Sequence, residues 1–167
     1  MFKLISGVAL FAFCVLLGKY FSAKKSKKAA FYSALCDFNA NFIKELNFSR
    51  KKISELLVPD YSSKNFNDLI LLVKQKKCEQ NAVELKNELS GEWQNGLDLS
   101  GGQIGDIENY FSFLGSSDAT SQSDECSRYS EIFKKQLAES EKGDKTLGVL
   151  YKKLGFIIGL IAFVVVL

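Results

Sequence analysis

The fold is decided by the stretch Leu154-Gly-Phe-Ile-Ile-Gly-Leu-Ile-Ala-Phe-Val-Val-Val-Leu167, fourteen residues without a charged side chain. As a helix this stretch spans about 21 Å, against roughly 30 Å for the hydrocarbon core of a bilayer. Residues 147–151 lengthen the apolar helix, while Lys152 and Lys153 reach toward the headgroups. A run of this length also suits the buried core helix of a soluble protein. We interpret residues 151–167 as a C-terminal transmembrane helix.

A second apolar segment lies near the N-terminus, where residues 4–18 carry no charge. A cleaved signal peptide is the alternative interpretation, but no small-x-small cleavage site follows the apolar run. We therefore interpret residues 1–23 as a retained transmembrane helix with a basic flank. Five lysines lie within residues 19–28, whereas Lys3 alone precedes the apolar run. The positive-inside rule then places residues 24–150 in the cytoplasm and both chain ends outside.

The charge of the chain is distributed unevenly. The formal net charge is +3, but eight of the 22 basic residues lie outside residues 29–151. Residues 29–151 contain the other 14 basic residues and all 19 acidic residues, which gives this stretch a net charge of −5. Because phosphate binding needs a concentrated basic face, this charge argues against a nucleic-acid partner.

The middle of the chain predicts an all-α helical bundle. Apolar residues recur at three- and four-residue steps, which is typical of amphipathic helices. The predicted helices cover residues 26–57, 65–77, 81–95 and 100–114, and a last long helix runs directly into the C-terminal segment. An interruption of the first of these helices at residues 47–50 stays open. Val58-Pro-Asp-Tyr-Ser-Ser63 predicts a loop. Gly115-Ser-Ser-Asp118 predicts the end of one helix and the cap of the next.

The residue types needed for common catalytic and metal sites are missing. The chain has no histidine, which excludes Ser-His-Asp and Cys-His catalysis and every histidine-bearing metal site. Its four cysteines are far apart and predict reduced packing residues. The segment 101–105 is glycine-rich but lacks the Gly-Lys-Ser/Thr of a P-loop. Segments 22–25 and 49–52 match S-x-x-K without its companion motifs. We therefore predict no catalytic, metal or cofactor-binding residue.

Gly155 and Gly159 form a G-x-x-x-G pair inside the apolar C-terminal run. This spacing puts two small residues on one face, so that another helix can approach closely. Three interpretations stay open. Transmembrane helices tolerate glycine in general, the pair packs on the first helix through Gly7 or Ala12, or it packs on a partner subunit.

Two motifs of the chain are distinctive: Phe113-Leu-Gly-Ser-Ser-Asp118, followed by Gln122, and Leu150-Tyr-Lys-Lys-Leu-Gly155. They resemble motifs of the stage III sporulation protein AB family of endospore-forming bacteria. The first is similar to the family's L-G-x-S-D-x-x-x-Q turn. Leu150-Tyr-Lys-Lys-Leu-Gly155 is similar to the family's Leu-Gly entrance to the second anchor, and Trp93 matches less specifically. The resemblance singles out these residues: Trp93, Leu114, Gly115, Ser117, Asp118, Gln122, Tyr151, Leu154, Gly155 and Gly159. Residues 39–63 depart from the family pattern.

The resemblance implies a non-enzymatic membrane platform. Its helical body is expected to be similar to the cytoplasmic domain of secretion platform proteins. The protein is then expected in the outer forespore membrane, with its body in the mother-cell cytoplasm, as part of the channel complex between the two cells. The expected partners are the membrane, the sporulation ATPase (stage III sporulation protein AA) and other complex subunits, and a homo-oligomer stays open. The alternative is a small membrane-anchored enzyme or lytic factor.

Overall fold

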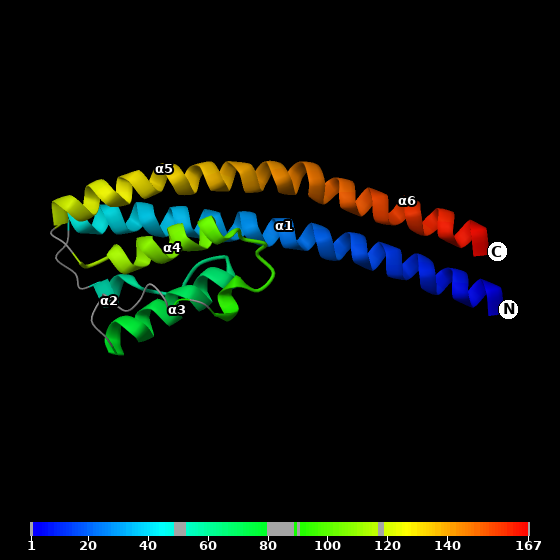
Figure 1. Cartoon of the computed structure of the whole chain (residues 1–167), viewed down its shortest axis with the longest axis horizontal. Coiled ribbons are helices and arrows are strands. Elements are labelled where there is room, and N and C mark those ends of the chain that lie inside the picture. The colour runs from blue at the N-terminus through cyan, green and yellow to red at the C-terminus, as the bar shows by residue number, and fades with distance from the viewer. Residues whose placement is uncertain (1, 49–52, 80–88, 90, 117–118, 167) are drawn as a thin grey trace. The chain divides into compact units, whose positions relative to one another are not determined.

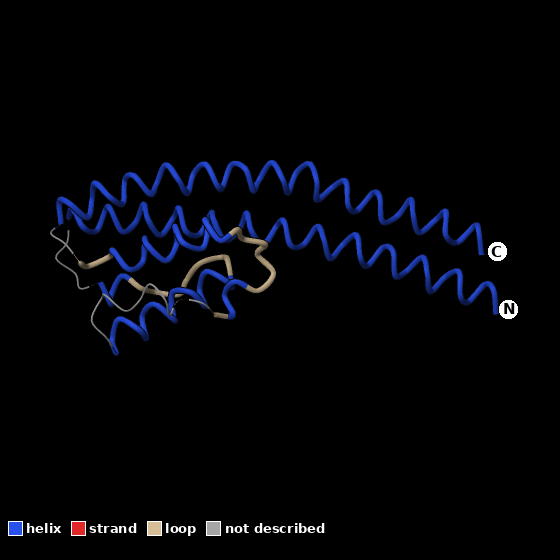
Figure 2. Tube along the Cα trace, viewed as in Figure 1, coloured by secondary structure: helices blue, strands red, loops and turns tan. Residues whose placement is uncertain are grey.

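The structure is a computed structural model, and it describes residues 2–48, 53–79, 89, 91–116 and 119–166. Every regular element in these ranges is helical, which confirms the all-α prediction (Figures 1 and 2). In chain order the elements are α1 (Phe2–Phe48), α2 (Ile53–Leu56), α3 (Lys64–Glu79), the 3₁₀ helix η2 (Glu92–Gln94), α4 (Gly101–Phe113), α5 (Ala119–Gly143), the π-helical turn η3 (Asp144–Gly148) and α6 (Val149–Val166).

The chain divides into two compact units, each described by itself. The first, which we call the anchor unit, consists of Met1–Ala29 and Glu139–Leu167. The second, which we call the body, consists of Ala30–Ala138. Helix α1 supplies residues to both units, and so does α5.

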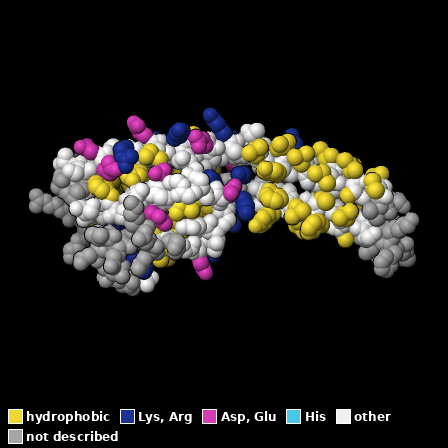
Figure 3. Space-filling view, viewed as in Figure 1, with side chains coloured by type: hydrophobic (Ala, Val, Ile, Leu, Met, Phe, Trp, Pro, Cys, Tyr) yellow, Lys and Arg dark blue, Asp and Glu magenta, His cyan; other side chains and the backbone are white. Residues whose placement is uncertain are grey.

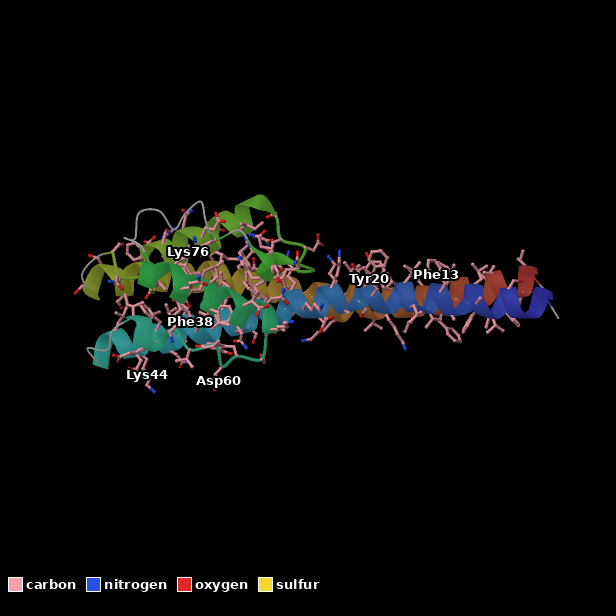
Figure 4. The ribbon with its side chains drawn as sticks, turned by 90° about the horizontal axis from the view of Figure 1, so that it is seen from below. Phe13, Tyr20, Phe38, Lys44, Asp60 and Lys76 are labelled. Atoms are coloured by element: carbon pink, nitrogen blue, oxygen red, sulfur yellow. The ribbon has the colours of Figure 1, made fainter. Side chains whose placement is uncertain are left out.

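The body is built around an aromatic core. Phe38 of α1 lies at its centre and packs on Phe66 of α3 and Phe111 of α4, with ring centroids 5.9 and 5.7 Å apart (Figure 4). Tyr110 of α4 extends the core to Phe133 of α5, at 5.1 Å in an edge-to-face arrangement. All five side chains are buried. Because such ring pairs add to the gain from apolar burial, these contacts tie four helices into one bundle.

Local capping fixes the ends of α4. Ser100 and Gln103 form a reciprocal capping box at its start, where the sequence predicts that a helix begins. At its end Gly115 has φ +87°, the left-handed conformation that glycine adopts without strain. The predicted helix end at Gly115 is therefore confirmed, and the predicted loop at 58–63 is confirmed as well.

One predicted helix end is wrong, and two predicted helices differ in detail. The helix predicted over 26–57, with an interruption left open at 47–50, is the later part of α1, which ends at Phe48, and residues 53–56 form α2. The helix predicted over 81–95 is contradicted at its end. Gly91 is extended, Glu92–Gln94 is a 3₁₀ turn, and residues 80–88 and 90 lie outside the described residues. The last helix does continue to Val166, but through the unpredicted π-helical turn Asp144–Gly148.

The short η2 turn is fixed by contacts to another element. Asn65 of α3 donates through its Nδ2 to the main-chain oxygens of Trp93 at 2.7 Å and Asn95 at 3.0 Å. Gly96 then takes a positive φ of 78°, which ends the turn. Because the α3 side chain binds carbonyls that an α-helix would use internally, the tertiary contact overrides the helical periodicity.

Candidate functional site

The anchor unit carries nearly all the exposed large hydrophobic side chains of the described residues. The structure has two helices long and apolar enough to cross a membrane, within Ser6–Leu46 and Thr120–Val165. Among the described residues, twenty large hydrophobic side chains are exposed, and Val58 and Leu71 are the two of them that lie in the body. Figure 3 shows these apolar side chains gathered over the anchor unit. The body, by contrast, contains the whole set of buried core residues.

Glycines bring the two helices of the anchor unit into backbone contact. A Cβ atom added to Gly155 would lie 2.8 Å from the Cys14 oxygen and 3.1 Å from the Gly18 Cα. A Cβ added to Gly159 would lie 2.9 Å from Cδ2 of Phe11 and 3.2 Å from its oxygen. Since real Cβ atoms essentially never come within 3.0 Å of another heavy atom, the contact at Gly155 depends on glycine. We call this contact surface the glycine seam.

The structure places the G-x-x-x-G pair inside one chain. Of the interpretations left open by the sequence, packing on the first helix is the one seen here. The expected partners differ, however. Gly7 lies against Phe163, since a Cβ on it would be 3.1 Å from that ring, and Ala12 is exposed. The atoms nearest to a Cβ added at Gly155 or Gly159 belong instead to Phe11, Cys14 and Gly18.

Two pairs of aromatic rings connect α1 and α6 near the glycine seam. Phe11 and Phe156 meet edge to face at 5.6 Å, and Phe21 and Tyr151 lie 5.8 Å apart. Beside the seam runs a groove of about 310 Å³. Its walls are two stripes of residues at positions i, i+3, i+4 and i+7, beginning at Cys14 on α1 and at Tyr151 on α6. The family-motif residues Tyr151, Leu154 and Gly155 therefore line one continuous feature.

The π-helical turn ends at the glycine seam. Gly148, its last residue, is buried, and a Cβ there would lie 3.2 Å from Oγ of Ser22 and 3.1 Å from Oδ1 of Asp144. Ser22 is also buried, at 4% exposure. Ser22 is the serine of one S-x-x-K match, and the structure gives it a packing position. π-Helical turns are rare, and many of those known lie at functional sites. This one joins α5 to α6.

The described motif residues of the L-G-x-S-D turn connect helices of the body. Gln122 is buried and accepts a hydrogen bond through its Oε1 from the Gly115 N–H at 3.2 Å. The Leu114 side chain is buried, and its oxygen accepts a hydrogen bond from Nζ of Lys77. Burial lowers the pKa of Lys77 from 10.5 to about 8. Ser117 and Asp118 lie outside the described residues. The described part of this motif thus joins α4 to α3 and α5.

Trp93 has a structural position in the body. It is 1% exposed and stacks on Phe31 at 5.6 Å, with an angle of 15° between the rings. Its Nε1 donates to the Leu89 oxygen at 2.5 Å. Because both the ring and its donor are satisfied inside the core, the tryptophan belongs to the fold of the body.

A buried polar connection in the body has no sequence signal. Asn39 of α1 donates to the Cys126 oxygen at 2.9 Å and accepts from the Tyr110 hydroxyl at 2.9 Å. Burial raises the pKa of the Cys126 thiol to about 11, so this cysteine stays protonated. Cys14, Cys36 and Cys126 are free thiols. In the part of the chain that the structure describes, no group of three or more histidine, cysteine or carboxylate residues is placed to hold a metal.

The comparisons with known proteins give one match. A family model described as stage III sporulation protein AB matches residues 3–167, nearly the whole chain. No curated protein and no solved structure matches the chain.

Proposed function

Because the chain belongs to the stage III sporulation protein AB family, we propose that it is a non-enzymatic platform subunit of the channel complex between mother cell and forespore. The anchor unit holds the chain in the outer forespore membrane. The body lies in the mother-cell cytoplasm and docks the sporulation ATPase, stage III sporulation protein AA, to membrane components. Its helical fold serves this role as the cytoplasmic domain of a secretion platform protein does.

The observation that supports this proposal best is the separation of buried and exposed apolar residues. The most apolar windows of the two long helices are only 17% and 18% buried. A core helix of a soluble protein would instead hide most of its apolar surface. The exposed apolar side chains of the anchor unit are suited to contact with lipid. The buried core residues of the described chain, by contrast, all lie within residues 30–138.

Membrane anchoring is tested by fractionation and cysteine labelling in sporulating cells. The full chain is expected to stay in the membrane pellet through alkaline carbonate extraction. A cysteine in place of Asp60, an exposed body residue, is expected to react from the mother-cell side (Figure 4). A chain released by carbonate, or an Asp60→Cys variant labelled by an impermeant reagent added outside intact cells, contradicts the proposed anchoring and topology.

ATPase docking is tested at two exposed carboxylates of α5. Asp124 and Glu131 are both exposed and lie seven residues apart, so they share one helix face. Since the body is acidic, we expect a basic partner surface. The double variant Asp124→Lys, Glu131→Lys should lose ATPase capture. The matched control reverses the charges of Glu55 and Asp60, which are also exposed, and this variant should still capture the ATPase. Capture by the α5 variant at wild-type strength would reject docking on this face.

We propose no enzymatic function. Ser22 lies packed in the anchor unit beside Gly148, and the second S-x-x-K match overlaps residues 49–52, which lie outside the described residues. No observation therefore favours the enzyme or lytic-factor alternative over the platform.

A further inference from the structure

The groove beside the glycine seam is built from exposed apolar side chains over a backbone floor. Four of its rim residues are between 41% and 53% exposed: Leu17, Phe21, Leu154 and Ile158. The floor lies at Gly18 and Gly155, where the two helices touch. Figure 4 shows Phe13 and Tyr20 of the same helix, which project outward and do not line the groove. The groove is therefore a narrow apolar furrow that follows the helix pair.

The stripe that forms the α1 wall continues into lysines. Lys24 and Lys25 follow Phe21 by three and four residues, so the helix places them on the same face, one turn beyond the groove. The amine of Lys24 lies 5.5 Å from the ring centroid of Tyr20, which stands next to the groove without lining it. A positive charge therefore lies within about one helical turn of the end of the furrow.

The surrounding charge is strongly positive. The anchor unit has ten lysines and three carboxylates, those of Glu139, Glu141 and Asp144. Asp144 lies against the seam at Gly148, and Glu141 pairs with Lys145 at 3.8 Å. Residues 19–28 contain five lysines and no acid. An anionic group is the complementary partner for this end of the groove.

We propose that the groove binds an acyl chain of an anionic phospholipid whose phosphate lies at Lys24 and Lys25. A transmembrane helix of a partner suits the groove less well. Helices pack closely through small residues, and Gly18 and Gly155 already meet each other's backbones, with a Cβ on Gly155 only 2.8 Å from the Cys14 oxygen. A flexible acyl chain fills the furrow between the rim side chains and leaves the headgroup at the lysines. The proposal rests on the membrane anchoring proposed above.

The test uses the full chain reconstituted into phosphatidylcholine bilayers that contain spin-labelled phosphatidylglycerol or spin-labelled phosphatidylcholine. The fraction of each label immobilised by the protein gives their relative association. We expect phosphatidylglycerol to associate at least about twofold better, with the preference lost in about 1 M salt, where the screening length is roughly 3 Å. The double variant Lys24→Gln, Lys25→Gln should lose the preference. The same changes at Lys134 and Lys135, exposed on α5 in the body, should not.

Two neighbouring isoleucines test the groove itself. Ile158 lines it and Ile157 does not, although the two are 53% and 52% exposed. Ile158→Trp should reduce immobilised phosphatidylglycerol, and Ile157→Trp should leave it unchanged. Equal association of both lipids with the wild-type chain, or equal effects of the two tryptophans, overturns the proposal. A chain dimer that Ile158→Trp dissociates also overturns it, since a second helix would then fill the groove. Failure to reconstitute would instead refute the anchoring.

Discussion

Replacing Gly159 by cysteine should produce a disulfide with Cys14 inside one chain. The Cβ of a residue at position 159 would lie 3.4 Å from the Cys14 Cβ. Bridged cysteines have Cβ atoms about 3.5–4.5 Å apart, so the pair needs a shift of only a few tenths of an ångström. The nearest obstacle is Cδ2 of Phe11 at 2.9 Å, the far end of a side chain that can rotate.

The disulfide should close a loop of about 145 residues and stabilise the fold by roughly 5 kcal/mol through the unfolded chain. Membranes containing the Gly159→Cys chain are oxidised and then denatured, and free thiols are counted with a maleimide mass tag. The wild type has four cysteines and should keep four thiols. The variant has one cysteine more, and oxidation should remove two thiols from the same chain.

Ile157→Cys is the matched control, because Ile157 is exposed and the seam lies on another face of α6. It should keep all its thiols. If oxidised Gly159→Cys instead runs as a covalent dimer, the glycine pair packs between chains, and the intrachain seam is refuted.

Three further outcomes concern the body, measured by unfolding of the full chain in detergent. Tyr110→Phe should cost about 1–3 kcal/mol, because it leaves a buried acceptor on Asn39 without its donor. Gly115→Ala should lower the free energy of unfolding by more than about 1 kcal/mol, because Gly115 has a positive φ. Gly105 lies in a helix with open space around it, so Gly105→Ala should raise the free energy of unfolding by up to about 1 kcal/mol. Equal effects would contradict the left-handed cap. The pKa of Lys77 is lowered to about 8, so between pH 8 and 10 the unfolded chain binds more protons and stability should rise by about 2 kcal/mol. The matched variant Lys77→Met should lack this rise.

Local patterns account for much of what the sequence predicted correctly. The apolar end segments, the loop at 58–63 and the start of the helix at residue 100 each follow from residues that are neighbours in sequence. Gly115 was predictable for the same reason, since a left-handed residue after a helix favours glycine. The domain boundaries and the family-motif roles stay predictions, because no measurement in the structure tests them.

The errors arise where contacts between distant residues decide the conformation. The helical periodicity of residues 91–95 was overridden by Asn65, which lies one element earlier in the chain. The partners of Gly155 and Gly159 depend on how α6 aligns with α1, which spacing within one helix does not reveal. Asn39 has the spacing of an ordinary helix residue, so its buried hydrogen bonds gave no signal.

The turn at Asp144–Gly148 also sets the rotational phase of the last helix. Ser140 and Gly148 are both buried and lie eight residues apart, whereas Gly148 and Gly155 are seven apart, or two α-helical turns. The spacing of eight contains one residue more than two α-helical turns. The π-helical turn accommodates this residue, so that Ser140, Gly148 and Gly155 lie on one side of the helix. In a related chain with one residue fewer in this turn, a regular α-helix would keep these positions on one side. With two residues fewer, α6 would be rotated about its axis by about 100°. Chimeras that exchange the ends of such proteins therefore need junctions matched by turns, not by residue count.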